Sequence, residues 1–177
     1  MDLKRHSGDA LGRYRAFLVR GALNTQPQAV VRPQSVEQVA AIASYATERG
    51  IPLVPWGGGT GIMGGAIPHR GGVVLDLKGL DQFHWIDSET RTVAVGVGVI
   101  LEDLGREMET HGLVLGHDPW SRPIATVGGA ISTNGVGYLA GKYGSMGDQV
   151  LGLEVVLASG KLLRPTRVPK SSGPALD

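Results

Sequence analysis

Short apolar runs separated by polar stretches divide the first half of the chain. Residues 29–33, 51–54 and 73–77 have the length and the branched aliphatic content of β-strands, and the third is apolar enough to be buried on both faces. A glycine-rich stretch fills the interval between the second and third runs. We therefore expect three strands here, with a loop joining the last two.

An amphipathic helix is expected between the first two strands. Ser35 stands three residues before Gln38, which is the spacing of a capping box, and Gly50 is placed to end the helix. The apolar positions of this segment share one face at the helical period. They are Val36, Val39, Ala40 and Ala43.

The second half shows alternation and a second helical period. Residues 85–86 and 91–99 are expected to be strands, with valines on one face of the longer strand and alanine or glycine on the other. A helix is expected over 101–111, and residues 153–157 and 161–164 flank a short turn in the manner of a hairpin. The pattern predicts an α+β fold with two subdomains that divide near residues 78–90.

Composition narrows the classes of function. The chain has 177 residues, is 42% hydrophobic and carries a net charge of +1, so it can bury a core, and no electrostatic surface for nucleic acid is expected. No apolar stretch is long enough for a membrane span, and the N-terminus lacks the apolar centre of a secretion signal. The sequence has no cysteine, which excludes disulfides and thiolate metal sites, and the cytoplasm is the expected compartment.

Glycine is the unusual component, with 28 residues, about twice the usual share. Six of them fall in the stretch 55–65, where the backbone must bend tightly or approach another group closely. The pattern G-x-G-x-x-G fits here, with Asp76 near the position of a ribose-binding acid. However, the interval between Gly65 and Val73 is too short for the crossover helix of a Rossmann unit. A P-loop also fails, because Gly141-Lys142 is followed by Tyr143.

Two interpretations of the loop remain open. The N–H groups of residues 57–61, with the hydroxyl of Thr60, can form a nest for a phosphate. The alternative is a glycine-rich hairpin without a ligand. A second segment, 118–157, is again rich in glycine and in small hydroxyl residues, so the two together suit a long ligand with a pyrophosphate. Within it, Asn134-Gly135 alone is equally well explained as a turn.

Three motifs occur in order: P-x-G-G-G-T-G at 55–61, D-P-W-S-x-P-I-A-T-V-G-G-A-I-S-T-N-G at 118–135, and K-Y-G-S-M-G-D-Q-V-L-G-L-E-V-V-L at 142–157. Together they resemble the FAD-binding region of the vanillyl-alcohol oxidase/PCMH superfamily, over about residues 27–173. The branch with the FAD-linked subunit of glycolate oxidase and D-lactate dehydrogenases is the most similar. The resemblance implies an FAD-binding PCMH-type fold, in which FAD lies between two α/β subdomains.

The resemblance also implies a domain organisation. It covers residues 27–173 as the FAD-binding domain, while residues 1–26 are weakly patterned and polar and are expected to be a helical arm or a frayed lead-in. Subdomain 1 would cover about 27–80 and subdomain 2 about 84–173, the latter incomplete at its C-terminus.

In that family both glycine-rich segments hold the pyrophosphate and reach the flavin. The positions carried over to this chain are Trp56, Gly57, Gly58, Gly59, Thr60, Gly61, Pro119, Ala125, Thr126, Gly128, Gly129, Ser132, Thr133, Asn134, Gly135, Tyr143 and Gly144. Relatives with a covalently attached flavin carry the linking histidine at the position of Thr60. Threonine offers no such bond, so the resemblance implies non-covalent FAD.

The activity implied by the resemblance is oxidation of a small 2-hydroxy acid, with hydride equivalents passing to the flavin. The alternatives are a flavin-using synthase of the alkyldihydroxyacetone-phosphate type, a non-catalytic FAD-binding module, and a subunit of an oxidase complex. Family members place the substrate-binding and base residues in a C-terminal cap, which this sequence does not contain. We therefore expect an N-terminal fragment or truncated product, and we assign no catalytic residue and no metal.

The remaining polar candidates are expected to be structural. The pair His117-Asp118 is adjacent in sequence, which does not place the two side chains together. Four histidines show no metal-ligand spacing and are expected at the surface. They are His6, His69, His84 and His111.

Overall fold

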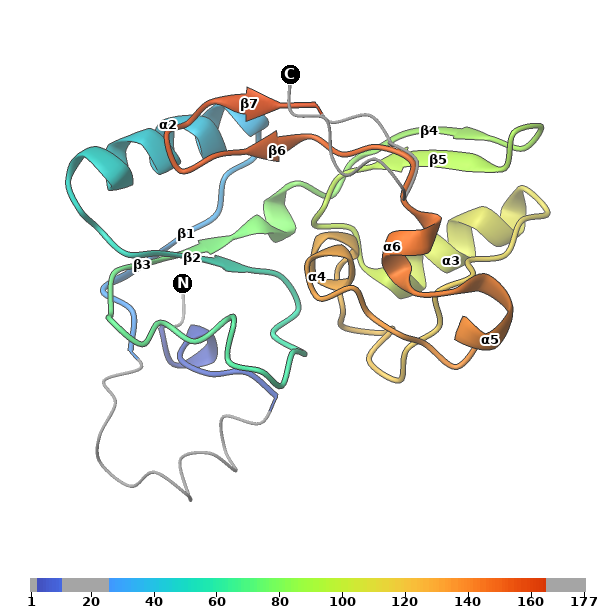
Figure 1. Ribbon diagram of the computed structural model, residues 1–177, viewed down its shortest axis with the longest axis horizontal. Coiled ribbons are helices and arrows are strands. Elements are labelled where there is room, and N and C mark those ends of the chain that lie inside the picture. The colour runs from blue at the N-terminus through green and yellow to red at the C-terminus, as the bar shows by residue number, and fades with distance from the viewer. Residues whose placement is uncertain (1–2, 11–25, 165–177) are drawn as a thin grey trace, which may run out of the picture.

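A three-stranded parallel sheet forms the first half of the computed structural model, which describes residues 3–10 and 26–164 (Figure 1). Its strands are β1 (Ala29–Val31), β2 (Leu53–Trp56) and β3 (Val73–Asp76), in the order β1-β3-β2. The central strand β3 is buried, with Val74 fully enclosed, as its apolar sequence predicts. All three strands therefore end at the same edge of the sheet.

Helix α2 (Val36–Glu48) connects β1 to β2 and begins where the sequence predicts. The Ser35 hydroxyl accepts the N–H of Gln38 at 3.3 Å, and Gly50 follows the helix with a positive φ of 62°. The buried positions of the helix are Ala43 and Ala46. Small side chains thus allow close packing on this face.

The connection from β2 to β3, residues 57–72, contains no helix. The absence of a crossover helix agrees with the exclusion of a Rossmann unit from the length of this interval. The backbone instead turns at several glycines, and the one-turn 3-10 helix η2 (Leu77–Gly79) follows β3. The predicted cofactor loop therefore leaves the sheet at its carboxyl edge.

The second half is built on an antiparallel pair and a helix. Strands β4 (Phe83–Asp87) and β5 (Thr92–Val95) pair around a tight turn, and α3 (Leu101–Thr110) follows as predicted. Strand β5 ends four residues before the predicted Val99. The core beneath consists of Val99, Leu101, Leu104, Met108, Ala125, Val127, Ala130 and Met146.

Three short helices that were not expected from the sequence follow α3. They are α4 (Val127–Ser132), α5 (Ala140–Tyr143) and α6 (Met146–Gln149). In Figure 1, α4 lies on the side facing the parallel sheet, and α5 lies on the opposite side. Among the described residues, no helix has the length and apolarity to cross a membrane.

A small hairpin returns the chain to the first half. Strands β6 (Val155–Val156) and β7 (Leu162–Leu163) confirm the hairpin predicted from sequence and lie beside α2 (Figure 1). The Thr47 hydroxyl donates to the carbonyl of Ala158 at 2.5 Å. The strongly mixed order of helices and strands is the α+β fold that the sequence predicts.

The N-terminal segment is partly described. Residues 3–10 contain the one-turn 3-10 helix η1 (Lys4–His6) and lie against the glycine-rich loop rather than forming a separate arm. The rest of the arm predicted over 1–26, apart from Gln26, and the tail after residue 164 lie outside the described residues.

Candidate functional site

The glycine-rich loop folds back over the last side chain of β2. Trp56 is 4% exposed, and a Cβ at Gly59 would overlap the Trp56 ring. Gly59 has a φ of 67°, which side-chain-bearing residues rarely adopt. The loop therefore packs on the Trp56 indole, and glycine is required at the point of contact.

The two glycine-rich segments meet in the structure. A Cβ added to Gly57 would overlap the Thr126 hydroxyl oxygen, and one added to Gly58 would overlap the carbonyl oxygen of Ile124. Segments separated by some seventy residues thus touch through backbone and a single hydroxyl. The two segments expected to hold one ligand are therefore in direct contact.

Unused hydrogen-bond donors line this surface. The N–H groups of residues 57–61 donate to no acceptor among the described residues, and all five residues are only partly exposed. Consecutive N–H groups in a stretch where four of five residues are glycine are the chemistry of an anion nest. A diphosphate offers only acceptor oxygens at neutral pH, so the loop fits the phosphate bridge of a dinucleotide.

The second segment is held in place by the backbone of residues 97–101. The N–H of Leu101 donates to Ala125 O at 2.9 Å, and the N–H of Gly128 donates to Val97 O at 2.8 Å. Thr126 is 1% exposed and caps α4 by accepting the N–H of Gly129 at 3.2 Å. Ala125 and Thr126 are therefore buried and fixed where the loop contacts them, and Gly129 is exposed.

The predicted residues at the end of α4 are exposed but partly engaged. The Ser132 and Thr133 hydroxyls donate to Gly128 O at 2.7 Å and Gly129 O at 3.0 Å, respectively. The Asn134 side chain accepts the N–H of Gly147 at 2.9 Å, with Asn134 at a φ of 46°. Asn134 and Gly135 thus make the turn that holds α6 against α4.

Three further predicted positions have local structural partners. Pro119 O accepts the N–H of Arg122 at 3.0 Å in a turn. Tyr143 ends α5 and packs on Gly116, and Gly144, with a φ of 77°, lies against the Asp148 carboxylate. Asp148 also caps α6 through Ser145. In Figure 1, α5 lies on the side of α4 away from the parallel sheet.

His117 is buried beneath the turn that follows α4. It is 2% exposed, its ring lies against Gly135, and its Nδ1 atom has no hydrogen-bond partner among the described residues. Burial lowers the pKa of the His117 imidazole, and the neighbouring Asp118 opposes this shift only in part. A neutral imidazole packed in this way supports the structural interpretation of the His117-Asp118 pair.

A buried ionic cluster at the carboxyl edge of the sheet was not recognised from the sequence. Asp76 is fully buried and accepts from Arg32 at 2.7 Å, and its Oδ2 lies 3.2 Å from His6 Nε2 and 3.6 Å from Lys78 Nζ. Burial would raise the pKa of the Asp76 carboxyl, but Arg32, Lys78 and His6 together lower it. The expected surface position of His6 is wrong, since it is 1% exposed. No signal in a polar N-terminal segment indicates this pairing.

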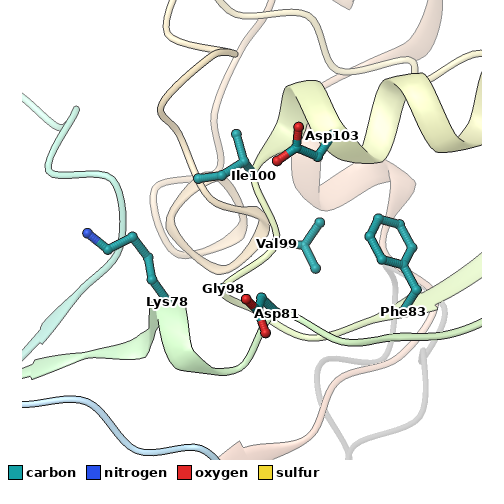
Figure 2. A pocket seen from close by; sticks show the side chains of 7 residues that line it. All are labelled: Lys78, Asp81, Phe83, Gly98, Val99, Ile100 and Asp103. Atoms are coloured by element: carbon teal, nitrogen blue, oxygen red, sulfur yellow. The ribbon is translucent and has the colours of Figure 1, made fainter.

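A shallow pocket of about 200 Å³ lies between η2, β4 and the start of α3 (Figure 2). It is lined by Lys78, Asp81, Phe83, Gly98, Val99, Ile100 and Asp103. None of the predicted cofactor-binding positions lines it. In the part of the chain that the structure describes, no group of three or more histidine or acidic side chains is placed to hold a metal ion.

Comparison with known proteins connects this geometry to a family. The FAD binding domain family matches residues 27–166. The glycolate oxidase subunit GlcD of Bacillus subtilis (strain 168) is 41% identical over 140 residues, which are 79% of this chain and 30% of that protein. A D-lactate dehydrogenase of Archaeoglobus fulgidus is 42% identical over 134 residues, covering 76% of this chain and 30% of that protein.

A solved structure agrees with the sequence comparison. That of an alkyldihydroxyacetonephosphate synthase superposes with a TM-score of 0.78 and 28% identity, over 89% of this chain and 32% of that one. This chain thus spans about 30% of the length of the curated relatives named above.

Proposed function

Since this chain belongs to the FAD binding domain family, we propose that it is the cofactor-holding part of a flavin-dependent oxidoreductase that acts on a small 2-hydroxy acid. The observation that carries the proposal is the contact between the loop at 57–61 and residues 124–126, which leaves a row of unused N–H donors on one surface. The names of two relatives, a glycolate oxidase subunit and a D-lactate dehydrogenase, support the substrate class.

In this proposal the chain's own residues bind and orient the cofactor. The N–H groups of residues 57–61 hold the diphosphate. Thr126 contacts Gly57 of the loop and accepts the N–H of Gly129, which fixes the second segment against the loop. Residues 132–135, at and just after the end of α4, would extend this surface toward the flavin. When bound, FAD supplies a two-electron acceptor for oxidation of the substrate.

Thr60 supports non-covalent attachment of the flavin. It lies in the middle of the loop, and a hydroxyl forms no stable bond to the flavin comparable to that of a linking histidine. The cofactor would therefore be released intact when the protein is unfolded by acid.

A second candidate is an enzyme like alkyldihydroxyacetonephosphate synthase, since the fold of a solved synthase superposes on 89% of this chain. A non-catalytic FAD-binding module remains a further reading of the same surface. All three use the same diphosphate-binding surface, and they differ in whether a 2-hydroxy acid reduces the bound flavin.

The test is expression of the chain, followed by an absorbance spectrum before and after acid precipitation. We expect yellow protein that releases free FAD into the acid supernatant. Stripped protein that takes up no added FAD would refute every flavin-based function. Loss of the flavin absorbance on anaerobic addition of D-lactate or glycolate would support the oxidoreductase over the synthase-like and module functions.

A further inference from the structure

The N-terminal segment, Leu3 to Ala10, crosses the outer end of the glycine-rich loop. The backbone N–H of Ala10 donates to Gly61 O at 3.0 Å, and the Asp9 carboxylate accepts the N–H of Gly64 at 2.8 Å. Gly61 is the last residue of the predicted cofactor loop, and Gly64 is buried with a φ of 85°. The segment thus holds the end of the loop that residues 124–126 do not contact.

The same segment also contacts the start of the loop. The His6 and Trp56 rings lie 5.0 Å apart between centroids, tilted by 56°. Trp56 directly precedes Gly57, and its ring lies against Gly59. His6 therefore packs on the Trp56 ring at the start of the loop, while Asp9 and Ala10 bond to Gly64 and Gly61 at its end.

His6 is anchored to the rigid part of the fold. Its Nε2 atom lies 3.2 Å from Asp76, which ends β3 and also pairs with Arg32, the residue after β1. This contact is buried on both sides and belongs to a cluster in which Arg32 and Lys78 also lie against Asp76. The segment is therefore tied to the carboxyl ends of the parallel strands as well as to the loop.

We propose that residues 3–10 are a brace that pre-organises the FAD-binding loop, with Asp9 and His6 as positioning residues that do not touch the cofactor. This inference rests on the proposed function, in which residues 57–61 bind the diphosphate. A glycine-rich loop loses much conformational entropy when it binds a ligand. Contacts that order the loop beforehand reduce this loss and so tighten binding.

Asp9 offers the cleanest test, because it is only partly buried and a single carboxylate oxygen makes its contact with the loop. We compare Asp9→Ala with Asp9→Asn, whose carboxamide oxygen can still accept the Gly64 N–H. Ser7→Ala is the matched control, since the Ser7 hydroxyl bonds to Leu3 O at 2.8 Å, within the segment itself. Circular dichroism confirms that each variant is folded.

Two measurements are made on the stripped chain. Hydrogen–deuterium exchange without FAD reports the order of residues 57–65, and a fluorescence titration gives the dissociation constant for FAD. We expect Asp9→Ala to raise exchange at Gly64 about tenfold and to weaken FAD binding about tenfold, the size of a lost hydrogen bond to a charged acceptor. Asp9→Asn should restore most of both, and Ser7→Ala should match the parent.

The outcomes separate the brace from the proposed function. Parent-like exchange and parent-like affinity in Asp9→Ala would overturn the brace, as would faster exchange with no change in affinity. If the parent itself takes up no FAD, the proposed function fails, and the exchange of the unliganded loop alone decides whether residues 3–10 hold it. His6→Phe is the second variant, because it keeps a ring against Trp56 while it removes the bond to Asp76. Faster loop exchange in this variant would support the anchor, and unchanged exchange would count against it.

Discussion

Gly58→Ala is expected to separate the two glycine-rich segments. No positive φ is required at Gly58, so alanine can adopt its backbone conformation and any effect is steric. The new Cβ would overlap Ile124 O and lie 2.9 Å from its carbonyl carbon and 3.1 Å from Ala125 Cα. All three are main-chain atoms, which cannot rotate away.

The segment opposite Gly58 cannot easily recede. The N–H of Ile124 donates to Ser121 O at 2.9 Å, and Ala125 O accepts the N–H of Leu101 at the same distance. The loop must therefore move instead, which disperses its N–H groups. Overpacking of this kind costs about 1–3 kcal/mol. If the whole cost falls on the bound state, the affinity for FAD drops by about 5-fold to 150-fold.

A titration with FAD and a thermal melt of the stripped protein measure the two parts of this cost. Any strain that remains without FAD should lower Tm, by about 2–4 °C for each 1 kcal/mol in a chain of this size. Gly65→Ala is the matched control, since a Cβ there meets no atom within 4 Å and no positive φ is required. Gly58→Ala protein with the affinity and Tm of the Gly65→Ala control would refute the close contact between the segments.

Two further substitutions test the scaffold. The pKa of His117 is lowered in the folded chain, so the unfolded chain binds more protons below the ordinary histidine pKa of about 6.5. The free energy of unfolding should therefore fall as the pH drops below that value, by at most about 1.4 kcal/mol per pH unit. Urea melts should show a shallower fall for His117→Gln, and parallel curves for the two proteins would contradict the burial of a neutral imidazole. Ser35→Ala removes the hydroxyl that caps α2 and should cost about 1 kcal/mol in free energy of unfolding without changing FAD affinity, and an unchanged melt would show that the cap contributes nothing.

Local signals in the sequence were sufficient for most of the first half of the fold. The cap at Ser35, the glycine at the end of α2 and the apolar run of β3 each act within a few residues, and each predicted element is present. The short helices α4, α5 and α6 were missed because they are too short for a helical period, and their stability comes from caps and tertiary contacts. The capping box between Ser145 and Asp148 was a local signal that could have indicated α6.

The candidate site, too, could be predicted from the sequence only in part. Glycine content and motif order indicated both segments, and the structure brings residues 57–58 against 124–126. The support beneath them depends on pairs far apart in sequence, such as His6 with Asp76 and Asp9 with Gly64. No periodicity or spacing in a single sequence indicates such pairs, so the N-terminal segment was expected to be an arm.

The return of the β6–β7 hairpin to α2 has a consequence for synthesis on the ribosome. Thr47 and its acceptor Ala158 are 111 residues apart. At a translation rate of about 5–20 residues per second, α2 emerges roughly 6–22 s before the strands that cover it. During synthesis, the side of α2 that packs on the β6–β7 hairpin therefore stays uncovered until nearly the last element of the described chain has emerged.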